Sequence, residues 1–155
     1  MLENTEEYTA VASGPLVDSG LMCNFVANKN SYEDEEKYEA MKAFMKVYFK
    51  TLDWMAENTE EVVQYCVDMS DENGSSMEPE IVEKYVQADK YYTLDEAVQM
   101  METKAEGSEY SEMESNLMDV LDFFISVGNY MEGDDEKFAG HVDSTLLKEV
   151  LDESK

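Results

Sequence analysis

DEEKYEAMKAFMKVYFKTLDWMAE, at residues 34–57, is the longest and most strongly patterned stretch of this sequence. Its apolar side chains recur at steps of three and four, and no Gly or Pro interrupts it. Because an α-helix turns once every 3.6 residues, this spacing places them on one face: Tyr38, Met41, Met45, Tyr48, Leu52 and Met55, widened by Phe44 and Phe49. The polar residues fall largely off that face: Lys42, Lys46, Lys50 and Asp53. We expect a core helix whose start is capped by Ser31 and Asp34.

The remainder of the sequence alternates polar loops with short amphipathic segments, so that residues 34–155 are expected to hold about six helices. Each segment carries a helix-start signal. These are Asn58 with Glu61, Pro79, Thr93 with Glu96, Ser111 with Glu114, and Asp143. The second long helix, which begins at Ser111, is expected to end near Gly128.

Residues 1–33 differ from this pattern and predict a strand, a loop and a second strand. The β-prone stretches are residues 8–12 and 21–27, and the second is apolar enough to be buried on both faces. The loop between them is longer than a tight hairpin needs, so the pairing of the two strands stays open. The expected fold class is mainly α with a short two-strand β element, in one domain over residues 1–155.

The charge is extreme, with 11 Lys, no Arg and 37 Asp or Glu, for a net charge of −26. Such a chain repels phosphate backbones and anionic membrane surfaces, which disfavours nucleic-acid and lipid partners. No segment is apolar and long enough to span a bilayer, and no export signal is recognised. The simplest interpretation of the charge is a highly soluble acidic surface.

The sequence contains few candidate catalytic groups. His141 is the single histidine, and no nucleophile motif or glycine-rich phosphate loop is present. Cys23 and Cys66 are isolated thiols whose pairing the sequence leaves undecided. The acidic loop after residue 69 is a weak Ca²⁺ candidate, with Asp71, Asn73 and Glu80 at three EF-hand positions but Met69 at the first. No catalytic residue, metal or cofactor is assigned.

Three stretches, in order, resemble the C-terminal half of substrate-binding proteins of ABC importers, in the nitrate, sulfonate, taurine and thiamine-precursor group. EYTAVASG at residues 7–14 is similar to a strand that ends in ASG in the family. NFVANK at 24–29, MKAFMK at 41–46 and ENTEE at 57–61 are similar to one continuous passage of the family. DFFI at 122–125 with GNY at 128–130, then VDSTLLKEVL at 142–151, resembles its closing helices.

The resemblance implies the C-terminal part of a two-lobed, periplasmic-binding-protein-like α/β fold, which closes on a small organic solute and delivers it to a permease. It places ligand contacts in the loop at residues 13–24, with Ser13, Asp18, Ser19 and Asn24 as polar candidates. Family members are extracytoplasmic and about twice as long, so the chain is expected to correspond to a C-terminal fragment. Helices that cover a sheet in the family would then need another partner, and we expect a homo-oligomer.

Two function classes follow for this chain. The first is a non-catalytic solute-binding protein, or its C-terminal part, for a sulfonate, nitrate or pyrimidine. The second is an acidic, helical, self-associating interaction module without a small-molecule ligand, which dimerises or docks a basic partner. We do not expect an enzyme, because the sequence shows no pairing of a nucleophile with a base and no set of metal ligands.

Overall fold

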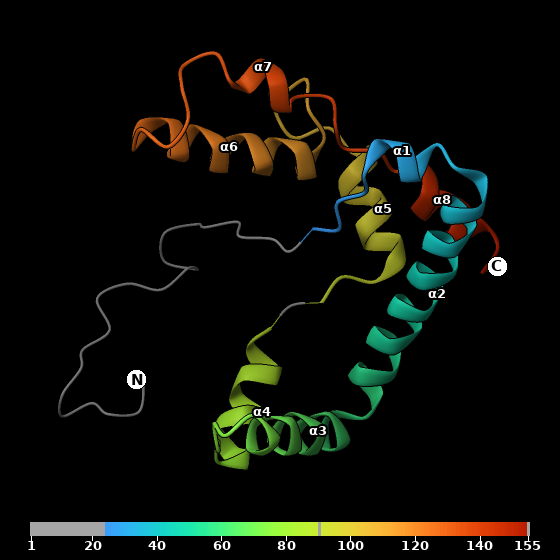
Figure 1. Cartoon of the computed structure of the whole chain (residues 1–155), viewed down its shortest axis with the longest axis vertical. Coiled ribbons are helices and arrows are strands. Elements are labelled where there is room, and N and C mark those ends of the chain that lie inside the picture. The colour runs from blue at the N-terminus through green and yellow to red at the C-terminus, as the bar shows by residue number, and fades with distance from the viewer. Residues whose placement is uncertain (1–23, 90, 155) are drawn as a thin grey trace.

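The structure is a computed structural model and describes residues 24–89 and 91–154. These residues form a mainly helical fold (Figure 1). In chain order the helices are α1 (Lys29–Tyr32), α2 (Glu35–Glu57), α3 (Thr59–Glu72), α4 (Pro79–Ala88), α5 (Leu94–Glu102), α6 (Glu112–Ser126), α7 (Asp135–Phe138) and α8 (Thr145–Asp152). The six expected helices are confirmed as α2 to α6 and α8, and the short α1 and α7 were not predicted.

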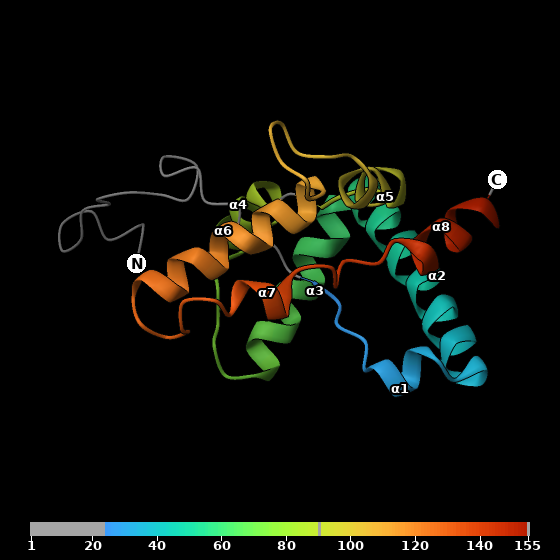
Figure 2. The ribbon, with the colours of Figure 1, turned by 90° about the horizontal axis from the view of Figure 1, so that it is seen from above.

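Helix α2, of 23 residues, is the longest helix and runs along one side of the molecule (Figure 1). Its first half contacts α1 and α8, and α8 in turn contacts α5. Its second half leads into the α3–α4 hairpin, which lies at the far end of the molecule from α6 and α7. Helix α6 contacts α5 and α7, and α7 lies alongside α6 when the molecule is seen from above (Figure 2).

The main core cluster lies between α2 and α8. It consists of Met45, Phe49, Leu146 and Val150, with Val150 only 1% exposed. Half-buried side chains from α1, α2, α5 and α8 pack around it: Tyr32, Tyr38, Met41, Tyr48, Leu52, Leu94, Ala97 and Leu147. Residues 45 and 49 are four apart, as are 146 and 150, so each helix presents one stripe to the other. The stripe predicted on α2 is thus largely confirmed.

Two details of that prediction are wrong. Phe44 was expected to widen the buried face, but its ring is exposed. Lys42 was expected off the apolar face, but it is buried. Both errors have one cause, because α8 approaches α2 from the side that carries Lys42, which rotates the covered stripe away from Phe44. A lysine tolerates this position since its methylene stem packs against apolar neighbours while its ammonium finds carboxylates.

The helix starts follow local chemistry. Thr93 and Glu96 form the reciprocal capping box expected from the sequence, and Ser111 accepts a hydrogen bond from the backbone N–H of Glu114. Pro79 occupies the first turn of α4. Asp34, rather than Ser31, caps α2 by accepting from the N–H of Lys37, because Ser31 lies within α1. The side chain of Asp143 accepts the N–H of Thr145 at the start of α8, whose N-cap residue is Ser144.

Several helix ends use other devices. Gly128 follows α6 with φ +80°, a left-handed conformation that suits glycine and ends the helix where expected. The side chain of Asn58 makes no cap bond at the start of α3 and donates instead to the carbonyl of Trp54. The side chain of Glu114 turns away from its own helix and accepts the N–H of Gly140, which ties the segment after α7 to α6.

The predicted strand at residues 21–27 is not observed in its described part. Residues 24–27 adopt no regular secondary structure and are exposed, with the ring of Phe25 against those of Phe44 and Tyr48. The expected strand at residues 8–12 lies outside the described residues. Within them, the only β pairing is an isolated antiparallel bridge between Lys104 and Ser111. The two-strand element and the periplasmic-binding-protein-like sheet therefore remain predictions.

Candidate functional site

The ligand-binding residues predicted by resemblance lie almost entirely outside the described part of the chain. Ser13, Asp18 and Ser19 are not described, and Asn24 is the first residue that is. Asn24 is exposed and belongs to no helix or strand. The structure thus neither brings these four candidates together nor separates them.

The acidic loop between α3 and α4 holds the weak Ca²⁺ candidates, and its polar groups bond to one another. Asp71 accepts a hydrogen bond from the hydroxyl of Ser76 at 2.5 Å. The amide nitrogen of Asn73 donates to the carbonyl of Met69 at 2.7 Å, back into α3. Glu80 follows Pro79 in the first turn of α4. Across the described residues, no group of three or more His, Cys, Asp or Glu is placed to hold a metal ion.

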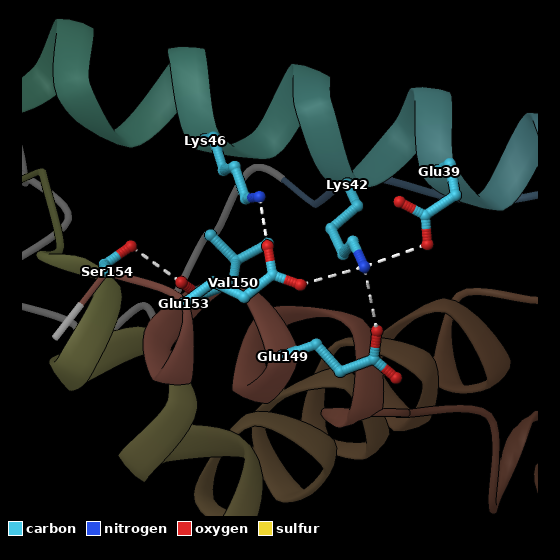
Figure 3. A network of polar contacts seen from close by, with 7 residues as sticks. All are labelled: Glu39, Lys42, Lys46, Glu149, Val150, Glu153 and Ser154. Atoms are coloured by element: carbon cyan, nitrogen blue, oxygen red, sulfur yellow. Dashed lines mark hydrogen bonds and ion pairs between the residues drawn. The ribbon is translucent and has the colours of Figure 1, made fainter.

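A network of polar contacts joins α2 to the α8 region (Figure 3). Lys42, whose side chain is 10% exposed, places its Nζ 2.9 Å from Glu39, 3.0 Å from Glu153 and 3.4 Å from Glu149. Glu153 also pairs with Lys46, so one carboxylate bridges two lysines from successive turns of α2. We call these five residues the α2–α8 ion network.

The electrostatics of the α2–α8 ion network stabilise the charged forms of Lys42 and Glu153. The hydrogen bonds that Lys42 donates to Glu39 and then to Glu153 raise the pKa of Lys42 above its usual value, against the opposing effect of desolvation. Hydrogen bonds from Lys46 and then Lys42 lower the pKa of Glu153. Both ammonium groups are occupied by carboxylates, which leaves this network structural in character.

Two half-buried tyrosines lie at the edge of the same core. The hydroxyl oxygens of Tyr32 and Tyr38 are buried without a partner at hydrogen-bond distance and angle, and their rings meet edge to face at 5.1 Å. Burial is the largest cause of the raised pKa of each, followed by the nearby carboxylates of Asp143 for Tyr32 and Glu149 for Tyr38. These carboxylates disfavour a phenolate without completing a full hydrogen bond. Both tyrosines stay neutral, which suits packing rather than acid–base chemistry.

Two shallow hollows flank the start of α5, and they share Asp53 and Thr93. The first, of about 260 Å³, is lined by Leu52, Asp53, Met55, Ala56, Thr59, Val86, Gln87, Asp89, Tyr91, Tyr92 and Thr93. The second, of about 380 Å³, is lined by Lys46, Phe49, Lys50, Asp53, Thr93, Leu94, Asp95, Val150, Leu151 and Ser154. Small-molecule sites typically range from about 300 to 1,000 Å³ and enclose most of their ligand. Both hollows are open to solvent; the volume of the first lies below that range, and the volume of the second lies at its small end.

The most distinctive surface is aromatic. On α6, α7 and the loop between them, seven large apolar side chains are exposed. One is Leu117, and we call the other six the α6–α7 face: Phe123, Phe124, Val127, Tyr130, Met131 and Phe138. Four of their rings form a continuous edge-to-face series. Phe123 meets Phe124 at 5.7 Å, Phe124 meets Tyr130 at 6.2 Å, and Tyr130 meets Phe138 at 5.4 Å.

Asp134 holds the loop that completes this series. Its carboxylate accepts the backbone N–H of Met131 at 2.9 Å and pairs with the Nζ of Lys137 at 2.6 Å. These two bonds, the Lys137 bond first, lower the pKa of Asp134. The turn they fix brings Tyr130, which precedes it, against Phe138, which follows it. The sequence shows the aromatic residues but does not show that they are exposed together, because their exposure depends on which other segments pack against α6.

The remaining reactive groups are isolated. The ring nitrogen Nε2 of His141 lies 3.1 Å from the carbonyl of Lys137, and the ring is exposed. Cys66 is a free, half-buried thiol, and Cys23 lies outside the described residues. In the portion of the chain that the structure describes, no helix combines the length and apolar character that crossing a membrane requires.

Comparisons with protein-family models, with curated proteins and with solved structures find no match to this chain.

Proposed function

We propose that this chain is a non-catalytic solute-binding protein, corresponding to the C-terminal part of a binding protein of an ABC importer. Its solute would be a small organic molecule or anion such as a sulfonate, a pyrimidine or nitrate, and its partner the importer's permease. The observation that supports the proposal is the uncovered apolar surface of α2 and α6, including Phe44 and Phe123. In two-lobed α/β proteins, amphipathic helices cover a central sheet, so helices of such a part would carry apolar faces of this kind.

In this proposal the solute contacts the loop at residues 13–24. Ser13, Asp18, Ser19 and Asn24 would supply hydroxyl, carboxylate and amide groups to its polar atoms. The ordered resemblance of residues 7–14, 24–61 and 122–151 to the family supports this assignment. The chain has no Arg, so an anionic solute would be held by neutral donors and lysines.

The experiment is a thermal-melting panel of the full chain with taurine, an alkyl sulfonate, nitrate and an aminopyrimidine. A ligand present at about ten times its Kd stabilises the folded state by about 1.4 kcal/mol, which raises Tm by roughly 3–6 °C in a protein of this size. We expect one compound class to do this and Asp18→Ala with Asn24→Ala to remove the shift. The matched control, Asp53→Ala with Thr93→Ser, alters the shared edge of the two hollows and should keep it. A shift lost only in the control, or no shift with any class, would refute the proposal.

The second candidate is an acidic, self-associating interaction module without a small-molecule ligand. The observation that favours it is the ring group formed by the exposed Phe25, which precedes α1, with the exposed Phe44 and the half-buried Tyr48 of α2; their centroids lie 4.9 to 6.4 Å apart. Exposed apolar groups of this size are typical of association surfaces. Because α2 exposes Lys37 and Lys50 among its acidic residues, a second copy would meet charges of both signs there.

Light scattering after size-exclusion chromatography tests self-association. The module predicts a molar mass above the 17.7 kDa of one chain, and Phe44→Ser should return it toward that value. Tyr65→Ser on α3 changes an equally exposed ring elsewhere and should leave the mass as it is. A monomeric wild-type chain would exclude this candidate.

A further inference from the structure

The α6–α7 face combines a series of four contacting rings with a loop that Asp134 holds in place. Phe123 is 61% exposed, and its neighbours Phe124, Tyr130 and Phe138 continue the ring series from α6 across the loop to α7. Asp134 fixes the loop between the two helices, so the series does not depend on a partner to form. A rigid set of aromatic rings offers contact area at low entropic cost, as in many protein–protein recognition surfaces.

Methionine and valine extend the face at the loop. Met131 and Val127 are both exposed beside the aromatic residues of the same segment. Methionine adapts its shape to varied apolar side chains, and it recurs on surfaces that receive amphipathic helices. Among the described helices, α6 makes its main contacts with α5 and α7.

The charge of the segment that carries the face is one-sided. Residues 109–138 contain a single cationic side chain, Lys137, and its ammonium is paired with Asp134. The acidic residues of the same segment are Glu109, Glu112, Glu114, Asp119, Asp122, Glu132, Asp134, Asp135 and Glu136. An approaching partner therefore meets carboxylates around the rings and no free ammonium within this segment.

From this juxtaposition we propose that the α6–α7 face is a docking site for a basic amphipathic helix of a partner protein. Large apolar side chains at positions i, i+3 or i+4, and i+7 of that helix contact the ring series. Its Lys and Arg side chains pair with the surrounding carboxylates and can also lie over ring faces. This proposal rests on the second candidate function, the acidic interaction module, and not on solute binding.

Charge decides against the other occupants. A second copy of this face would oppose two strongly acidic segments, and like charges across an interface are costly. Anionic lipid surfaces and nucleic acids are repelled for the same reason. A cationic helix gains from both the apolar rings and the carboxylates, which no other class of partner does.

The experiment measures binding of a labelled synthetic peptide to the full chain by fluorescence anisotropy. The peptide has about 18 residues, which make five helical turns, with Leu and Trp on one face and Lys on the other. One control peptide has the same composition with its apolar residues scattered around the helix, and another has Glu in place of every Lys. We expect saturable binding of the amphipathic basic peptide and at least about ten-fold weaker binding of both controls.

Variants locate the site. Phe123→Ala with Phe138→Ala should weaken binding about ten-fold or more, since buried aromatic anchors dominate such interfaces. Tyr65→Ala, which is 64% exposed on α3, is the matched control and should change Kd less than about two-fold. Asp122→Asn with Glu132→Gln should flatten the salt dependence between about 0.05 M and 0.5 M NaCl, whereas Glu60→Gln with Glu61→Gln should not. Circular dichroism verifies that each variant keeps its helix content.

Three results would overturn the proposal. The first is absence of binding by the amphipathic basic peptide. The second is equally tight binding of the scattered control peptide, or an unchanged Kd for the variant with both Phe123→Ala and Phe138→Ala. Either outcome would mean that the peptide binds through net charge alone. The third is loss of self-association in that variant, measured by light scattering, which would make the face a contact between copies. Because the mass measurement uses no peptide, self-association can survive when the docking proposal fails.

Discussion

The α2–α8 region and the α6–α7 region are built from similar residues but use them in opposite ways. In the first, Phe49 and Val150 are buried between two helices, and cations of α2 pair with carboxylates of α8. In the second, Phe123 and Phe138 are exposed, and the carboxylates outnumber the cations of their own segment. The difference is one of partners: α8 covers α2, whereas no described helix covers the outer side of α6.

This contrast separates the parts of the sequence that stabilise the fold from those available for recognition. Burying a phenylalanine ring removes apolar surface from water, and that contributes directly to the free energy of unfolding. An exposed ring contributes little to stability and remains available to another molecule. Substitutions in the two regions should therefore separate a loss of folding from a loss of binding.

The largest expected difference comes from the matched pair Phe49→Ala and Phe123→Ala. Phe49 is 7% exposed, so its truncation should lower the free energy of unfolding by about 3–5 kcal/mol, through lost burial and a cavity. Phe123→Ala should change it by no more than about 0.5 kcal/mol. Urea unfolding followed by circular dichroism measures both. Equal losses would mean that the α6–α7 face is covered in solution and would break the comparison.

A smaller effect is expected at the helix that lies between the two regions. Helix α5 contacts both α8 and α6, and its start depends on the Thr93 capping box. Thr93→Ala should cost about 1 kcal/mol, whereas Thr103→Ala, after the last residue of α5, should cost less. If the two regions unfold as one unit, the Thr93 substitution shifts the unfolding transitions seen by near-ultraviolet and by far-ultraviolet circular dichroism together. Separate transitions would show that the core and the α6–α7 region are independent.

The α2–α8 ion network should make a smaller, pH-dependent contribution. The folded pKa of Glu153 is lowered, mainly by Lys46 and then Lys42, so its contribution is present above the unfolded pKa of a glutamate. It should be lost as the pH falls through the lowered folded pKa. Protonation of the many other carboxylates relieves repulsion over the same range, so the measured quantity is the stability difference between wild type and Glu153→Gln. That difference should shrink on acidification, and a difference independent of pH would argue against the network.

The smallest expected effect is that of salt on local opening. Added NaCl screens the repulsion among carboxylates of residues 109–138 and also weakens the α2–α8 ion pairs. Hydrogen exchange should therefore slow modestly in α6 and α7 as salt increases, while α8 exchanges unchanged or slightly faster. A uniform response of all helices would show that the charge difference between the regions has no local consequence.

The sequence predicted the positions of the helices better than their contacts. Local signals such as Thr93 with Glu96, Pro79 and Gly128 act within a few residues, and the structure confirms them. Periodicity also identified the stripe around Met45. It did not identify the burial of Lys42, because that depends on Glu149 and Glu153, more than 100 residues away in the sequence.

The candidate sites were harder to predict for the same reason. Phe123, Phe124 and Phe138 have the spacing of ordinary core residues, and they form a surface because no helix among the described residues covers them. The resemblance-based site at Ser13, Asp18, Ser19 and Asn24 stays a prediction, since only Asn24 belongs to the described residues. The strand expected at residues 21–27 was inferred from apolar composition, yet Phe25 packs on exposed rings of α2 instead of in a sheet.

The pairing of Lys42 with Glu149 joins residues 107 positions apart in the chain. On a ribosome that adds about 5–20 residues per second, roughly 5–20 s separate the synthesis of these two side chains. During that interval the apolar stripe of α2, with Met45 and Phe49, has no α8 to cover it. The nascent chain must remain soluble with its main core face open, and its large negative charge provides the repulsion that keeps neighbouring nascent chains apart.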